Sequence, residues 1–72
     1  MELNEVQHKF GARLCRAMEA KGLSQSKLSG LSKISKTHLR QIMDGECNTS
    51  LDSIRRLAIA CEVEPKFFFD WE

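Results

Sequence analysis

Proline and glycine are scarce in this sequence, with one and four copies among 72 residues. Together with 42% hydrophobic residues, this scarcity excludes a disordered chain. β-Branched residues are few and no stretch alternates apolar with polar residues, so we expect an all-α fold. No run approaches the roughly 20 apolar residues of a membrane span, and the acidic start MELNE is not a signal peptide. We therefore expect a cytoplasmic protein without a membrane partner.

Catalytic and metal-binding patterns are missing as well. The sequence has no acid–base pair, no nucleophile beside a base and no phosphate-binding loop, so we expect one non-enzymatic domain over residues 1–72. Its three cysteines, Cys15, Cys47 and Cys61, cannot all pair within one chain. They also lack C-x-x-C spacing and a histidine placed to complete a zinc site. We expect reduced thiols, no metal and no cofactor.

Two short helical patterns follow one another in the middle of the chain. Ser24 and Ser35 are each suited to cap a helix, which predicts helices over residues 25–32 and 36–43. Gly45 can take positive φ just after the second helix. Apolar residues recur at helical spacing within and between the two helices: Leu28, Leu31, Ile34, Leu39, Ile42 and Met43. The connecting turn is too short for the helices to lie side by side, which predicts a helix-turn-helix over about residues 24–44.

The second of these helices has two different sides. Its apolar residues occupy one side, and Lys36, Thr37, Arg40 and Gln41 occupy the other. Such side chains donate to guanine, adenine or phosphate acceptors, and a short helix fits the major groove. The alternative is a solvated polar face, which is what most such patterns are.

The distribution of charge favours a nucleic-acid partner. With 11 basic and 10 acidic residues, the net charge of +1 argues against a polyanion partner for the chain as a whole. However, residues 20–43 contain no acid and five bases, which are Lys21, Lys27, Lys33, Lys36 and Arg40. A nearly neutral protein whose positive charge is gathered on one unit can attract phosphates at that unit.

The stretch LSQSKLSGLSKISKTHLRQIMDG, residues 23–45, resembles the lambda-repressor-like, Cro-type (XRE-type) DNA-binding family. The matching positions are Leu23, Ser24, Gln25, Leu28, Ile34, Ser35, Leu39, Ile42 and Gly45. The similarity extends over about residues 10–68. It implies a compact bundle of five short helices that binds operator DNA, usually as a homodimer. It also implies that Lys36, Thr37 and Gln41 read bases, with Arg40 beside them.

The same resemblance implies contacts to the DNA backbone. In relatives, the glutamine that matches Gln25 clamps a phosphate or braces the reading helix, although Gln25 can also simply cover the helix end. The turn after the reading helix carries Asp44 and Glu46, an odd choice beside phosphates, so contact is expected just beyond them. The expected phosphate contacts are Gln25, Ser26, Lys27, Lys33, Asn48 and Thr49.

Three departures from the family pattern lead to structural expectations. Lys33 stands where the turn commonly has glycine, and a lysine at positive φ would be strained by roughly 1 kcal/mol. Met18 and Met43 stand where many relatives have a buried ion pair, so we expect the two methionines to touch. Leu31 replaces a polar residue, which indicates either an exposed contact or a shifted helix.

The flanking segments predict supporting helices. Asn4 can cap a helix that ends at about Lys21, before Gly22, with a buried face of Phe10, Leu14, Ala17 and Met18. Thr49 and Asp52 are spaced as a capping box for another helix that ends at about Glu62. Its predicted buried face is Leu51, Ile54, Leu57, Ala58 and Cys61.

The C-terminal segment, residues 65–72, contains aromatic residues that one small core cannot hold. Pro65 suits the first turn of a last helix. Successive helical residues diverge by about 100°, so at least one of Phe67, Phe69 and Trp71 should be exposed in a monomer. This exposure favours a dimer contact. The alternative is that these rings wrap the edge of the core within one subunit.

These observations lead to one functional hypothesis and one alternative. The hypothesis is a transcriptional regulator, a repressor, that binds a palindromic operator in double-stranded DNA as a homodimer. Such proteins act by occupying promoters or by touching RNA polymerase. The alternative is an antitoxin-like or partner-binding module, in which the aromatic tail grips a toxin-like protein and DNA binding is secondary.

Overall fold

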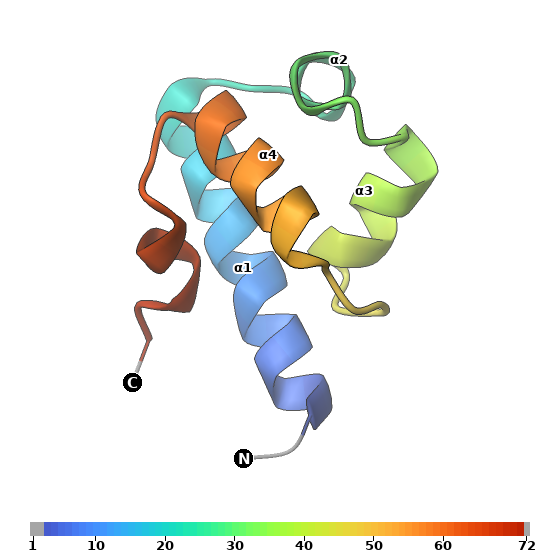
Figure 1. The fold of residues 1–72 in the computed structure, drawn as a ribbon, viewed down its shortest axis with the longest axis vertical. Coiled ribbons are helices and arrows are strands. Elements are labelled where there is room, and N and C mark those ends of the chain that lie inside the picture. Colours follow the sequence, from blue (N-terminus) through green and yellow to red (C-terminus); the bar gives the residue numbers. More distant parts are fainter. Residues whose placement is uncertain (1–2, 72) are drawn as a thin grey trace.

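The computed structural model describes residues 3–71, so residues 1–2 and 72 of the predicted domain lie outside the described residues. The elements are four α-helices and a 3₁₀ helix: α1 (Leu3–Lys21), α2 (Gln25–Ser32), α3 (Lys36–Met43), α4 (Leu51–Cys61) and η1 (Pro65–Phe69) (Figure 1). The all-helical class is confirmed, but the predicted count of five helices is corrected to four α-helices. None of the helices within residues 3–71 is both long and apolar enough to cross a membrane.

The last segment, η1, is a 3₁₀ helix whose backbone groups form hydrogen bonds both with neighbouring residues and with α1. Phe67 N–H donates to the Glu64 carbonyl at 2.9 Å, the short i to i−3 spacing of a tight turn. The Phe67 carbonyl accepts from Arg13 Nε of α1, also at 2.9 Å. Phe68 is completely buried in the core, and the five-residue 3₁₀ helix ends one residue later, at Phe69.

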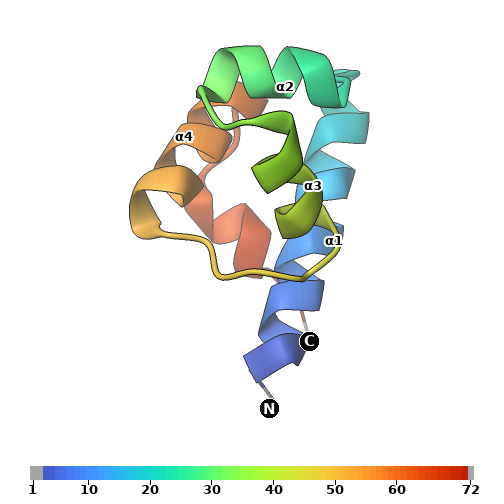
Figure 2. The same cartoon turned by 90° about the vertical axis from the view of Figure 1, so that its right-hand side faces the viewer.

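The core lies where α1, α4 and η1 meet the helix-turn-helix. α1 packs against α3 and η1, whereas α2 packs against α4 and α3. Figure 2 shows α2 across one end of the molecule and α3 descending from it, with the next segment crossing towards α4. The buried apolar residues are Phe10, Leu14, Ala17, Met18, Leu28, Ile34, Leu39, Ile42, Ile54, Leu57, Ala58, Cys61 and Phe68. Ile34, in the turn between α2 and α3, is therefore part of this core and fills the angle between the two helices.

The ends of the two central helices agree with the sequence prediction. The Ser24 hydroxyl accepts from Lys27 N–H at 3.1 Å, and the Ser35 hydroxyl accepts from His38 N–H at 3.2 Å. Gly22 and Gly45 both have positive φ, +67° and +73°. α2 and α3 begin and end at the predicted residues because caps and hydrophobic spacing are local properties.

Three predictions about the flanking helices are wrong. α1 begins at Leu3, so Asn4 lies inside its first turn and does not cap it. α4 is capped by Ser50, whose hydroxyl accepts from Ser53 N–H at 3.1 Å, and not by Thr49. Leu51, predicted to be buried, is 85% exposed because it is the first residue of α4 and precedes Ile54, where the buried part of the helix begins.

The methionine pair is placed on the inner side of the molecule. Met18 is buried, and Met43 is half-buried and packed against the core. Neither side chain projects into solvent, so the condition that would have refuted their contact is not met. Their direct contact stays a prediction.

Candidate nucleic-acid interface

The outer face of α3 is exposed to solvent. Its base-reading candidates Lys36, Thr37, Arg40 and Gln41 are all exposed. On the inner side, Leu39 and Ile42 are almost completely buried, which fixes the rotation of the helix about its axis. The four polar side chains therefore point away from the body of the chain, as the helical spacing predicts.

Unpaired positive charge gathers on the same unit. Lys21 forms an ion pair with Glu62 at 3.0 Å, and Arg40 forms one with Asp44 at 3.2 Å. Within residues 3–71, the remaining bases of the acid-free window, Lys27, Lys33 and Lys36, are exposed and form no ion pair. These three ammonium groups are available to phosphates without breaking an internal contact.

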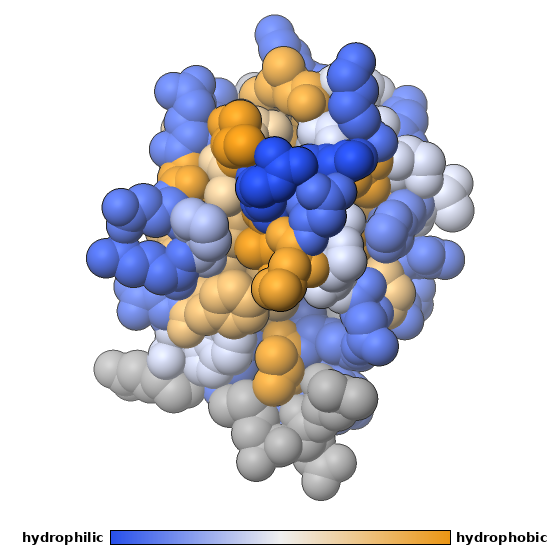
Figure 3. All heavy atoms as spheres, in the orientation of Figure 1, coloured by the Kyte–Doolittle hydropathy of each residue, from blue (hydrophilic) through white to orange (hydrophobic). Residues whose placement is uncertain are grey.

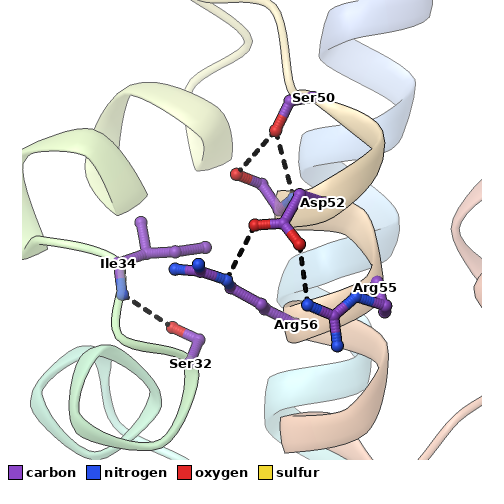
Figure 4. A network of polar contacts seen from close by, with 7 residues as sticks. Ser32, Ile34, Ser50, Asp52, Arg55 and Arg56 are labelled. Carbon is purple, nitrogen blue, oxygen red and sulfur yellow. Dashed lines mark hydrogen bonds and ion pairs between the residues drawn. The ribbon is translucent and has the colours of Figure 1, made fainter.

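The turn that carries α3 is held by two serines. Ser29 Oγ donates to the Ile34 carbonyl, and Ser32 Oγ accepts from Ile34 N–H at 3.3 Å (Figure 4). Ser32 Oγ also donates to the Leu28 carbonyl at 2.7 Å. The backbone N–H and carbonyl of Ile34 therefore both form hydrogen bonds with serine side chains. Sequence reasoning missed this function of the two serines.

Lys33 takes the left-handed conformation of the usual glycine in spite of the strain. It has φ 64° and ψ 25°, in the left-handed region, and its N–H donates to the Ser29 carbonyl at 2.9 Å. Leu31, two residues earlier, is 54% exposed while Leu28 and Ser32 are buried. Helix α2 is therefore not shifted, and Leu31 is an exposed apolar side chain next to the turn.

The phosphate candidates at the start of α2 have different surroundings. Ser26 and Lys27 are exposed, whereas Gln25 is half-buried and its Nε2 donates to Met43 Sδ at 3.4 Å. This contact joins the start of α2 to the end of α3. Of the two roles that the family implies for Gln25, bracing the reading helix is the one that this contact supports.

The segment after α3 lies against the first half of α1. An added Cβ at Gly11 would lie 2.5 Å from the Met43 carbonyl oxygen, so α1 and the end of α3 can only be this close at a glycine. Gly45 approaches His8 as closely, since a Cβ there would lie 2.9 Å from His8 Cα. Sequence reasoning missed both contacts, although a glycine inside a helical pattern signals close packing.

The loop candidates Asn48 and Thr49 also lie near α1. Gln7 Nε2 donates to Asn48 Oδ1, which leaves the Asn48 amide N–H groups for another partner. Thr49 is half-buried and lines a groove of about 250 Å³ together with Val6, Phe10 and Cys47. Asn48 is the more exposed of the two.

The start of α4 carries a compact ion-pair network. Asp52 accepts from Arg55 Nη2 at 2.7 Å and from Arg56 Nε at 2.9 Å (Figure 4). The hydrogen bond from Arg55, together with the positive charge of both arginines, lowers the pKa of Asp52 below its ordinary value of 3.8. Both arginines are therefore paired with an acid of their own helix, and the three side chains together keep a formal charge of +1.

The aromatic residues of the C-terminal segment are only partly covered. Phe69 is 44% exposed, whereas Phe67 and Trp71 are half-buried. The Phe69 ring lies 5.4 Å from that of Phe10 and 5.8 Å from that of Trp71, and the Arg13 guanidinium lies 4.0 Å from the centre of Phe67. The prediction that at least one of the three aromatic residues is exposed is confirmed.

A second apolar surface, missed in the sequence, lies on α4. Leu51 and Ile59, at i and i+8, are 85% and 65% exposed. Figure 3 shows apolar surface along α4, interrupted by a strongly hydrophilic patch near its middle. The sequence signal was present, because positions 51, 55 and 59 share one side of a helix.

The thiols offer little reactivity. Cys15, Cys47 and Cys61 are free, and burial raises the pKa of each above its ordinary value of 9.0. The carboxylates of Glu19 and Asp44 raise the pKa of Cys15 further. A thiol with a raised pKa stays protonated near neutral pH and is a poor nucleophile. Within residues 3–71, no three His, Cys, Asp or Glu side chains are grouped as metal ligands would be.

Comparison with known proteins gives two similarities. A family model described as "Helix-turn-helix domain" matches residues 9–66. Among solved structures, the restriction-modification controller protein C.AhdI from Aeromonas hydrophila is 40% identical in sequence, with a TM-score of 0.84. That similarity covers 88% of this chain and 96% of the other. No curated protein matches the chain.

Proposed function

The chain belongs to the helix-turn-helix family of DNA-binding transcription regulators, and from this membership we propose that it is a repressor that binds a palindromic operator as a homodimer. Each subunit lays α3 in one of two major grooves that face the same side of the duplex, one helical turn apart. Lys36, Thr37, Arg40 and Gln41 read base edges. The phosphate contacts are Gln25, Ser26, Lys27, Lys33, Asn48 and Thr49.

One observation carries this proposal. The outward face of α3 is uncovered, while the opposite face is anchored in the core, and three exposed lysines without an ion pair in the described chain surround it. A helix held in this way keeps its donors in a fixed pattern, which is what discrimination between base pairs requires. The lysines add attraction for any duplex.

The dimer is proposed from the exposed aromatic segment. Phe67, Phe69 and Trp71 form the contact, and the outer face of α4, with Leu51 and Ile59, extends it. A two-fold axis places the same surface of each subunit against its copy, and it also relates two identical reading helices. The pseudo-palindromic operator follows from that symmetry.

The biological setting follows from the similar structure. That structure is of a restriction-modification controller protein, and the similarity spans most of both chains. We propose that this chain controls transcription of a restriction-modification locus. Protein concentration and dimerisation then govern the occupancy of its operator.

Selection from a random duplex library with the purified full chain tests the proposal. We expect an enriched sequence with two-fold symmetry and half-sites about one helical turn apart. Binding should weaken steeply with salt, in proportion to the number of phosphates neutralised. If the library yields no enriched sequence even at low ionic strength, the chain is not a sequence-specific regulator.

The partner-binding alternative is favoured by the exposed apolar residues on α4 and η1, which suit a different protein as well as a second copy. Copurification of a different protein in stoichiometric amount, together with a monomeric chain in its absence, would support that alternative. Homodimers in sedimentation equilibrium would support the regulator.

A further inference from the structure

Asp44 is placed where an acid is expected to weaken DNA binding. It follows α3 directly, and its backbone N–H donates to the Arg40 carbonyl at 3.0 Å. A carboxylate there repels phosphates, and it also faces the negative end of the helix dipole. Neither local stability nor general attraction to DNA explains an acid at this position.

The carboxylate of Asp44 holds one of the base-reading candidates. Asp44 Oδ2 accepts from Arg40 Nε at 3.2 Å. Both side chains remain largely in solvent, with 69% of Arg40 and 46% of Asp44 exposed. An exposed ion pair of this kind contributes little to stability, and a base four residues before an acid is the weaker order on a helix.

The planar geometry of the guanidinium indicates a function for the contact between Arg40 and Asp44. Arginine has five N–H donors in a rigid planar fork. Because Asp44 is bonded to Nε alone, the edge formed by the two Nη groups stays free. That edge fits the O6 and N7 acceptors of guanine, which lie side by side in the major groove.

We propose that Asp44 is a positioning residue, which holds Arg40 by its Nε so that the two Nη groups read one guanine. This inference rests on the proposed function, since it requires α3 to lie in the major groove. In this role Asp44 increases the discrimination between base pairs, although its charge lowers the affinity for DNA of any sequence. It also makes Arg40 a base reader and not a phosphate contact.

The competing explanation is that Asp44 only repels DNA, and the two explanations predict opposite results. Removing a carboxylate that only repels tightens binding to every duplex by a similar factor. Removing one that positions Arg40 lowers the preference for a single base pair. Glu46 provides the matched control, because it is an exposed acid two residues away with no side-chain hydrogen bond or ion pair within the described chain.

The test is a random duplex library selection with four full-length proteins: the wild type, Arg40→Ala, Asp44→Asn and Glu46→Gln. Arg40→Ala identifies the base pair that Arg40 reads by losing the preference for guanine there, by about ten-fold or more. Asp44→Asn is expected to lower the preference at that same base pair about five-fold and to leave the other positions unchanged. Glu46→Gln should keep the wild-type preferences and bind all duplexes somewhat more tightly.

Three results separate the possible failures. If Asp44→Asn behaves as Glu46→Gln does, Asp44 only repels DNA and the inference is overturned. If Arg40→Ala lowers affinity equally for all sequences, Arg40 contacts a phosphate and the inference is overturned while the proposed function stands. If the wild type itself enriches no sequence, the proposed function fails and takes the inference with it.

Discussion

At the scale of single residues, two glycines inside helices have opposite surroundings. Gly11 of α1 faces the Met43 and Ile42 carbonyls, whereas a Cβ at Gly30 of α2 would meet nothing within 4 Å. Alanine gains about 0.5–1 kcal/mol over glycine in a helix interior, so Gly30→Ala should be stabilising by that amount. Gly11→Ala should be destabilising by about 1–3 kcal/mol, because the added methyl group forces α1 and α3 apart.

Urea unfolding at one protein concentration measures both variants of this pair. Equal stabilisation by the two substitutions would contradict the close approach of α1 to the end of α3. Since the proposed dimerisation would add to stability, the protein concentration has to be the same for all variants.

The strain at Lys33 gives a second prediction. Lys33→Gly should raise the free energy of unfolding by about 0.5–1 kcal/mol, because glycine adopts φ 64° without steric conflict. Lys33→Ala removes the same charge but keeps the strained conformation, so its stability should stay close to that of the wild type. In filter binding or anisotropy, both variants should lose similar affinity for all duplexes. A stability gain in the alanine variant would exclude strain as the cause.

At the scale of the element, α2 and α3 behave as one rigid part with separate functions for its two helices. The serine hydroxyls of α2 bind both backbone groups of Ile34, and Gln25 contacts the end of α3. The start of α3 is therefore fixed to the end of α2, and the end of α3 is fixed to the start of α2. A helix fixed at both ends can present its side chains to base edges without first being ordered, which limits the entropic penalty of binding.

This division predicts two kinds of binding defect. Thr37→Ala or Gln41→Ala should lose about 1–3 kcal/mol of discrimination at particular base pairs. Lys27→Ala should weaken binding to all sequences alike and reduce the salt slope by about one phosphate. Competition binding with operator and random duplexes separates these effects. An equal ratio of operator affinity to random-duplex affinity in all three variants would contradict this division.

At the scale of the whole molecule, the apolar surface of η1 and α4 is the feature that a single chain leaves uncovered. Phe69 packs on Phe10 but remains 44% exposed. Phe69→Ser should raise the dimer dissociation constant about ten-fold or more, as expected for an aromatic anchor at an interface. Sedimentation equilibrium measures this change. Leu31→Ser is the control, since it removes an exposed apolar side chain from α2 and should leave association unchanged.

A fold check accompanies the dimer measurement. Circular dichroism and thermal unfolding should show that Phe69→Ser keeps the helical content of the wild type. An unchanged dissociation constant in a folded Phe69→Ser variant would place the contact elsewhere, first of all on the outer face of α4.

The sequence by itself determined α2 and α3, their serine caps and the polar outer face of α3. These features depend on hydrogen bonds and side-chain spacing within a few residues, so they can be read along the chain. The acid-free window likewise needed no structure, and it correctly indicated where unpaired lysines gather.

Only the tertiary structure decided which surfaces meet. The apolar spacing predicts a buried Leu51, but the fold leaves this first residue of α4 85% exposed. The Gly11 contact, the Arg13 bond to Phe67 and the Gln7 bond to Asn48 join residues that lie far apart in the chain. No local pattern encodes such pairs, because the choice of neighbours depends on the simultaneous packing of all helices.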